Sequence, residues 1–143
     1  MAPTDNLARF LDAQTNTYEA ALKEIKSGRK TSHWMWFIFP QIAGLGLSET
    51  ARFYAIRNEK EAAEYLAHPV LGTRLIEIST ALVGLSTNNA IEVFGSIDSM
   101  KLKSSMTLFS LSENAHPVFQ KVLDKFFDGK KDEKTVALLN TTG

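Results

Sequence analysis

Three polar residues of different chemistry share one face of a predicted helix near the middle of the chain. Asp98, Lys101 and Ser105 are three and four residues apart, so an α-helix brings an acid, an amine and a hydroxyl together. Such a set could line a pocket, with Asp98 in a catalytic role and Lys101 and Ser105 binding a ligand. The alternative, which the sequence favours, is that Asp98 caps the helix and Lys101 is its ion-pair partner.

The helix that carries these residues is predicted to extend from Asp98 to about Leu111. Apolar residues form two separate stripes on it: Leu102, Met106 and Phe109, and Ile97, Met100, Leu108 and Leu111. A helix that is apolar on two sides contacts neighbours in two directions, so we expect it to be central. The Asp98 face lies between the stripes, and a broader polar face is expected to be solvated, with Ser99, Lys103, Thr107 and Ser110.

The second candidate is the aromatic segment 33–46. It contains both tryptophans and six consecutive large apolar residues from Trp34 to Phe39. Aromatic side chains bury about 150–250 Å² each, so most of this run is expected to be core. Function would lie with His33 as a general acid or base, and with Trp34, Trp36 and Gln41 as ligand-binding residues. The alternative role for His33 is to satisfy backbone groups at a helix start.

Two further features could contact an anion. Gly44 and Gly46 precede a predicted helix, where backbone N–H groups can surround a phosphate, and Arg74 lies on a later helix. The dinucleotide-binding pattern is incomplete, because Glu49 stands in place of its third glycine and no strand precedes the loop. The alternatives are a simple turn and a surface position for Arg74.

The sequence argues against metal, serine and cysteine chemistry. His33, His68 and His116 lack metal-ligand spacing, and no carboxylate cluster accompanies them. The chain has no cysteine, and Ser105 lies in no nucleophile-elbow pattern. We therefore expect no metal and no cofactor.

Composition narrows the possible partners. The 143 residues fit a single domain, 1–143, in which 16 basic residues balance 16 acidic ones. A net charge of zero argues against nucleic acid and anionic membranes, since both attract clustered Lys and Arg. No secretory-signal pattern and no bilayer-spanning apolar run is present. The expectation is a soluble, cytoplasmic monomer.

Periodicity predicts an all-α, single compact domain of about seven or eight short-to-medium helices around the buried aromatic segment. A first helix, capped by Thr4 or Asp5, is expected to continue to Gly28. The Trp34–Phe39 run is predicted to be a short helix capped by Thr31 or Ser32, because no second strand follows for it to pair with. Further helices are predicted over residues 49–56, 58–68, 69–85, 90–94, 98–111, 117–127 and 132–139.

Three long motifs, over residues 33–46, 65–75 and 94–109, resemble an uncharacterised bacterial and fungal family whose members are often labelled "calpastatin". The resemblance implies an all-helical, mainly monomeric domain and supports a helix in the aromatic run. It implies no activity and no catalytic residues, since none is established for the family. The calpastatin label would imply a disordered protease inhibitor, which the compact, aromatic composition argues against.

Three functional hypotheses follow. The leading one is a domain that binds a small polar ligand between Trp34–Gln41 and Asp98–Ser105. A distant likeness in size and helical character to glycosidase-type domains that handle ADP-ribose suggests a nucleotide-like ligand, by analogy of fold alone. The second hypothesis is an N-glycosidase for a nucleotide-derived substrate, with Asp98 or His33 as the catalytic group. The third is a protein-interaction module that uses exposed rings of the aromatic run.

Overall fold

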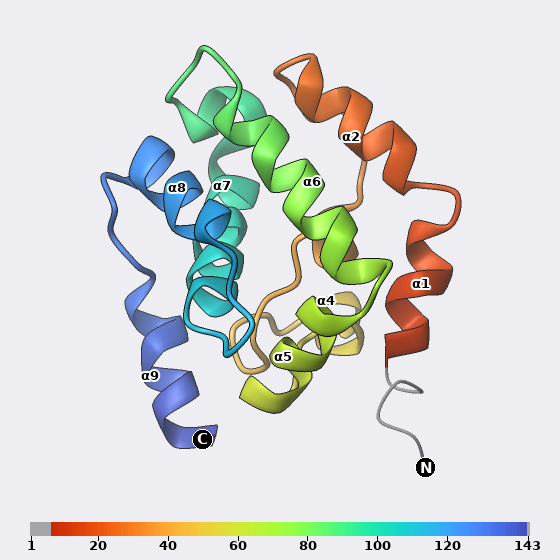
Figure 1. Cartoon of the computed structure of the whole chain (residues 1–143), viewed down its shortest axis with the longest axis vertical. Helices are drawn as coiled ribbons and strands as arrows, with labels where there is room; N and C mark the ends of the chain where they lie inside the picture. Colours follow the sequence, from red (N-terminus) through yellow and green to blue (C-terminus); the bar gives the residue numbers. More distant parts are fainter. Residues whose placement is uncertain (1–6, 143) are drawn as a thin grey trace.

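The predicted all-α class is confirmed by the computed structural model of the chain, which describes residues 7–142. Within this range the helices are α1 (Ala8–Gln14), α2 (Tyr18–Lys26), α3 (Met35–Ile38), α4 (Glu49–Phe53), α5 (Glu59–Ala67), α6 (Leu71–Val83), α7 (Ala90–Ser110), α8 (Pro117–Phe127) and α9 (Glu133–Thr142). Helix α6 crosses the front of the molecule with α7 behind it, and α8–α9 and α1–α2 lie on opposite sides (Figure 1). None of the helices described is both long and apolar enough to cross a bilayer.

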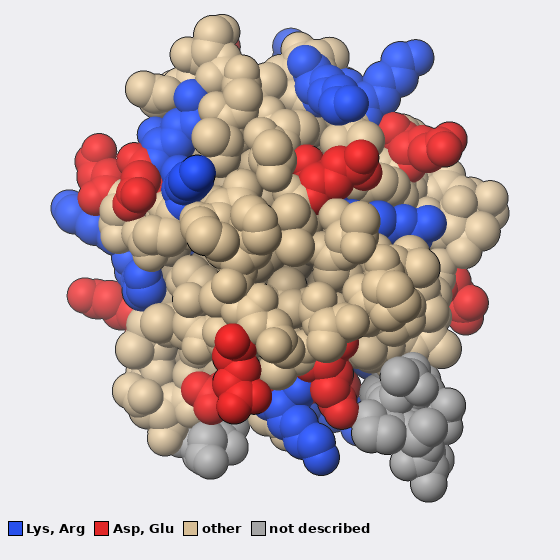
Figure 2. Space-filling view, viewed as in Figure 1, with Lys and Arg blue, Asp and Glu red and all other residues tan. Residues whose placement is uncertain are grey.

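The surface over α6 carries charges of both signs. Figure 2 shows acidic and basic side chains interspersed mostly around the margin of this face, with a largely uncharged centre. On this face the equal numbers of acidic and basic residues are therefore mixed rather than separated into patches.

The predicted first helix is two helices, which corrects the single helix expected up to Gly28. Helix α1 ends at Gln14, and a turn over residues 15–17 precedes α2. In this turn the Thr15 hydroxyl donates to the Leu11 carbonyl at 2.7 Å, and short polar side chains that bond to the backbone favour helix ends over helix interiors. Gly28 does follow α2, with a φ of 87°. The predicted caps Thr4 and Asp5 lie outside the described residues.

The aromatic run forms a helix as predicted, but its cap is different. Trp34 precedes the four residues of α3, and neither Thr31 nor Ser32 caps them. The backbone N–H groups of Thr31 and Ser32 instead donate to Glu24. Beyond Pro40 the chain forms an isolated parallel β-bridge between Ile42 and Ile56, which the sequence did not indicate.

Helix α7 spans both of the helices predicted over residues 90–94 and 98–111. Its two helical parts meet at Gly95, whose φ of 83° and ψ of 165° are not helical and make a kink between them. Only glycine adopts this conformation without strain. The cap at the start of α7 is Asn89, whose side chain accepts hydrogen bonds from Ile91 and Glu92. Asp98 therefore lies inside the helix and is not its cap.

The broad polar face of α7 is not solvated, contrary to expectation. Ser99 and Thr107 are buried, whereas Ile97, Met100 and Leu111 are exposed. The buried hydroxyls bond within their own helix or to the next one: Thr107 donates to the Lys103 carbonyl and accepts from the Asp132 N–H at 2.8 Å. Because these hydroxyls are satisfied locally, the face can pack against α8 and α9.

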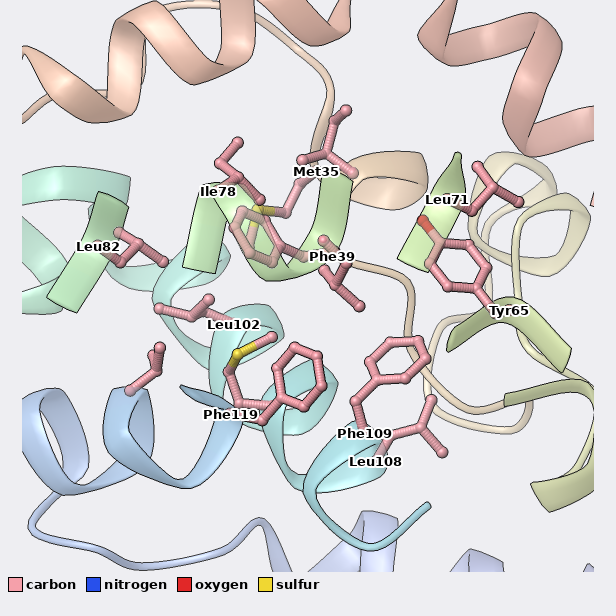
Figure 3. Close-up of a cluster of buried hydrophobic side chains, with 14 of the residues drawn as sticks. Met35, Phe39, Tyr65, Leu71, Ile78, Leu82, Leu102, Leu108, Phe109 and Phe119 are labelled. Atoms are coloured by element: carbon pink, nitrogen blue, oxygen red, sulfur yellow. The ribbon is translucent and has the colours of Figure 1, made fainter. Parts of the chain in front are cut away.

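Four aromatic rings run through the core and connect four helices. Phe10 of α1 meets Tyr65 of α5 edge-on, with ring centroids 5.1 Å apart. Tyr65 lies 5.4 Å from Phe109 of α7, and Phe109 lies 5.9 Å from Phe119 of α8. Figure 3 shows the ring of Phe109 between those of Tyr65 and Phe119. Phe10, Phe109 and Phe119 are completely buried, and Tyr65 is nearly so.

Several predicted helix starts are confirmed by their capping bonds. Ser48 accepts a hydrogen bond from Ala51 at the start of α4, and Asn58 accepts one from Glu61 at the start of α5. Two of the three histidines have a related role. His68 Nδ1 accepts from the N–H groups of Val70 and Leu71, and His116 Nδ1 accepts from Val118. Helix α4 ends at Phe53, three residues earlier than expected.

Candidate functional site

Asp98 lies between two lysines on the part of α7 that follows the kink. Its Oδ2 atom is 2.9 Å from Lys30 Nζ, and its Oδ1 atom is 3.5 Å from Lys101 Nζ. The ion pair with Lys101, part of the structural alternative for Asp98, is therefore present. Lys30 was not singled out from the sequence, because it lies in the loop after α2, far from Asp98 along the chain.

Each of the two lysines also lies over a tryptophan ring. Lys30 Nζ is 5.0 Å from the centroid of Trp34, and Lys101 Nζ is 4.9 Å from that of Trp36. Ammonium groups at such distances are attracted by the negative face of an indole. The five residues form a continuous series from one indole to the other, which we call the Asp98 cluster.

The Asp98 cluster is buried at one end and open at the other. Trp34 is completely buried and only 8% of the Lys30 side chain is exposed. At the other end Trp36 is half-buried, and 21% of the Asp98 side chain and 24% of the Lys101 side chain are exposed. Two ammonium groups face one carboxylate, so the cluster has a net positive charge.

Glu24 of α2 fixes the loop that supplies this cluster. Its carboxylate accepts hydrogen bonds from the N–H groups of Thr31 and Ser32, from the Ser32 hydroxyl and from Trp34 Nε1, at 2.7–3.0 Å. Burial alone would raise the pKa of Glu24, but these hydrogen bonds outweigh it and lower the pKa to about 2. The loop is further held by the Lys30 N–H, which donates to the Val93 carbonyl at 2.8 Å.

Gln41, a predicted ligand-binding residue, contacts α7 at Ser104, which neighbours the predicted Ser105. Gln41 Nε2 donates to Ser104 Oγ at 2.7 Å, and Ser104 Oγ is 3.1 Å from the Lys101 carbonyl oxygen. Ser105 is completely buried, and its hydroxyl has no hydrogen-bond partner among the described residues. Ser105 therefore faces the interior and not an open pocket.

The other predicted site residues lie elsewhere. His33 is exposed, and within the described residues its ring makes no hydrogen bond or ion pair, including none to the backbone of α3. Gly44, with a φ of 106°, and Gly46 belong to the loop before α4. Arg74 is engaged with α1 and α2, with Nη1 3.3 Å from Gln14 Oε1 and its guanidinium 5.1 Å from the Tyr18 ring centroid.

Tyr18 connects α2 to the part of α6 that carries Arg74. Its hydroxyl donates to Glu77 Oε1 and lies 3.0 Å from the Arg74 carbonyl oxygen. Burial and the hydrogen bond to Glu77 raise the pKa of Tyr18 well above its usual range. A tyrosine held in its protonated form in this way joins α2 to α6 rather than taking part in proton transfer.

Hollows in the surface occur away from the open end of the Asp98 cluster. A groove of about 450 Å³ runs beside α5, a hollow of about 270 Å³ lies between α1 and α4, and one of about 590 Å³ lies beside the start of α9. Neither Trp36, Asp98 nor Lys101 lines any of these three. No group of three or more His, Asp or Glu residues within the described range is placed to hold a metal ion.

Comparisons with known proteins identify relatives but no activity. A family model described as "Protein of unknown function (DUF1810)" matches residues 4–139. The chain is also similar to the crystal structure of the conserved hypothetical protein Rv1873 from Mycobacterium tuberculosis, with a TM-score of 0.93 and 42% sequence identity. That similarity covers 97% of this chain and 99% of the other. A search of curated proteins found no match.

Proposed function

We propose a function from the premise that this chain belongs to the DUF1810 family, whose description assigns no activity. The proposed function is the binding of a small polar ligand at the open end of the Asp98 cluster. The ligand would carry a planar ring and an anionic group, as nucleotides and ADP-ribose derivatives do.

One observation carries this proposal: the half-buried indole of Trp36 on α3 lies beside an ammonium group and a carboxylate on α7. A flat ring can stack on Trp36, since aromatic faces attract one another in offset arrangements. The ammonium groups attract a phosphate, and Asp98 can accept a hydrogen bond from a sugar hydroxyl. The partly exposed ammonium group of Lys101 supplies positive charge at the open end for an anionic ligand.

Lys101 accounts for the lack of a deep pocket at this place. Its ammonium group covers the Trp36 ring at 4.9 Å, so the side chain occupies the position that a ligand ring would take. A lysine side chain is long and flexible, and this one is partly exposed. When it moves away from the indole, its ammonium group becomes available to the anionic part of the ligand.

The two alternative functions have less support. An N-glycosidase needs a carboxylate whose charge is available to a developing oxocarbenium ion, but the two lysines offset the charge of Asp98. His33 makes no described contact that would join it to Asp98 as an acid–base partner. A protein-interaction module would need exposed rings, yet Trp34 and Phe39 are completely buried and Trp36 and Phe37 are exposed only in part.

Tryptophan fluorescence tests the proposal, because the two indoles differ in exposure. Titration with cyclic AMP or ADP-ribose, neither of which carries a phosphate monoester, should produce a saturable fluorescence change in the wild type. Trp36→Phe retains the buried Trp34 and should lose this change. Lys101→Met and Asp98→Asn should each weaken binding, measured by calorimetry, about tenfold or more. Lys125→Met is the matched control, since Lys125 lies 5.6 Å from the Phe126 ring elsewhere on the surface.

Two results would contradict the proposal. One is the absence of a saturable signal with both compounds up to millimolar concentration. The other is an unchanged affinity in both Trp36→Phe and Lys101→Met, which would place any binding outside the Asp98 cluster.

A further inference from the structure

Three arginines converge on the hollow of about 270 Å³ between α1 and α4. It is lined by Arg9 of α1, Arg52 and Phe53 of α4, Ala55 and Arg57 of the segment that follows, and Ala43 of the loop before α4. We call this hollow the arginine pocket. Its residues come from three separate parts of the chain, so the fold and not the local sequence brings the cations together.

Arg9 forms one side of the arginine pocket, and hydrogen bonds hold its side chain in place. Its Nε atom donates to the Phe53 carbonyl, and its Nη2 atom donates to the Ala55 carbonyl and to Glu61 Oε1, each at 2.8 Å. Glu61 is only 4% exposed, and its carboxylate balances the charge of Arg9. The bridge between Ile42 and Ile56 holds the neighbouring backbone in place.

Arg52 and Arg57 supply positive charge that no carboxylate within residues 7–142 balances through an ion pair. Both are exposed, and within residues 7–142 neither guanidinium takes part in a hydrogen bond or an ion pair. Two cations lining one small hollow repel each other, so an anion placed between them lowers the electrostatic energy. The planar guanidinium matches two oxygens of a phosphoryl group in a bidentate arrangement.

Phe53 adds an apolar surface to the same hollow. Its side chain is 58% exposed, and one edge of it meets Tyr54 with ring centroids 4.8 Å apart. An exposed aromatic ring beside two unpaired arginines provides contact area for the organic part of a ligand whose anionic part lies on the arginines.

We infer that the arginine pocket binds a small phosphate monoester. Its dianionic phosphoryl group lies between Arg52 and Arg57, and its organic part covers Phe53. The volume of about 270 Å³ lies below the range of about 300–1,000 Å³ usual for drug-sized ligands, so it suits a smaller molecule. The inference is independent of the function proposed at the Asp98 cluster, because the two sites share no residue.

Calorimetric titration of the full chain with phenyl phosphate and with inorganic phosphate tests this inference. The titration is made at pH 8, where the phosphoryl group is dianionic because its second pKa is about 6. Phenyl phosphate should bind more tightly than inorganic phosphate. Arg52→Ala and Arg57→Ala should each weaken both about tenfold, as expected for a lost charged hydrogen bond. Both residues are exposed, so the variants should fold.

Two further variants separate this site from a general effect of positive charge. Arg29→Ala removes an exposed arginine in the loop after α2 and should leave both affinities unchanged. Phe53→Ala should abolish the preference for phenyl phosphate while retaining the binding of inorganic phosphate. In the background of Trp36→Phe, Arg52→Ala and Arg57→Ala should still weaken both probes, which separates this result from the test of the Asp98 cluster.

Three results would overturn the inference. The first is no heat of binding with either probe at millimolar concentration. The second is an affinity for phenyl phosphate that the double variant Arg52→Ala/Arg57→Ala retains, or that Arg29→Ala reduces equally. The third is equal affinity of the wild type for the two probes, which would exclude a role for Phe53 and so a monoester ligand.

Discussion

At the scale of single residues, the chemistry of the site depends on contacts that no local pattern reveals. The helical spacing predicted that Asp98 and Lys101 lie together, and the structure adds Trp36 from the aromatic run. Lys30 could not be predicted, because its position over Trp34 depends on the loop that Glu24 holds. The arginine pocket could not be predicted either, since nothing in the sequence indicates that exposed arginines in separate segments lie close together.

Glu24→Gln should make the free energy of unfolding less dependent on pH. The pKa of Glu24 is about 2 in the folded protein, against 4.5 for a free glutamate. Its carboxylate therefore stabilises the fold fully above pH 4.5, and this stabilisation is lost as the pH falls toward 2. Urea unfolding at pH 7, 5 and 3 should show Glu24→Gln less stable than the wild type at pH 7, with a smaller difference at pH 3.

Glu19→Gln provides the control for this experiment. Glu19 is exposed on the same helix and makes no hydrogen bond within the described residues. Its substitution should leave the pH dependence unchanged. A difference between Glu24→Gln and the wild type that is constant from pH 7 to pH 3 would show that the hydrogen bonds to Glu24 do not stabilise its charged form.

At the scale of helices, some starts were predicted correctly, whereas the caps expected at Thr31 or Ser32 and at Asp98 were wrong. Ser48 and Asn58 begin helices where the sequence predicted, and Pro117 is the first residue of α8. The errors came from residues with two possible roles. The serines and threonines of α7 can face solvent or bond to their own helix when buried, and here most of them are buried. Tertiary packing decides between these roles.

Gly72→Ala should destabilise the contact between α5 and α6. A Cβ atom on Gly72 would lie 2.0 Å from the Leu66 carbonyl oxygen, which belongs to the backbone and cannot move alone. Overpacking of this kind costs about 1–3 kcal/mol. The thermal unfolding midpoint should therefore fall by several degrees, roughly 4 °C or more. Gly84→Ala is the control, because its Cβ would find its nearest neighbour at 3.5 Å. Equal midpoints for the two variants would contradict the prediction.

At the scale of the whole molecule, the core is organised by the rings that connect α1, α5, α7 and α8. The sequence predicted that the aromatic run would be buried, and Trp34 and Phe39 are. It did not predict that a second series of rings would hold the helices together. Phe10, Tyr65, Phe109 and Phe119 are distant along the chain, and only the three-dimensional contacts show the series.

Phe109→Ala should weaken the whole domain, because it removes the ring between Tyr65 and Phe119. Truncating a fully buried phenylalanine costs about 3–5 kcal/mol, from lost burial and from the cavity that remains. Urea unfolding should show a lower midpoint by circular dichroism. Phe53→Ala removes the same atoms from an exposed position and should change the midpoint little. A small effect of Phe109→Ala would mean that neighbouring helices close the cavity.

The bend at Gly95 leaves an exposed stretch in the middle of α7. Gly95, Ser96 and Ile97 are exposed, whereas the residues from Ser104 to Phe109 are buried. Backbone amide hydrogens at the bend should exchange with solvent through small fluctuations, and those from Ser104 to Phe109 only when the domain unfolds. Asp98 lies just after the bend, so we expect its part of α7 to open locally more often than the buried part that follows.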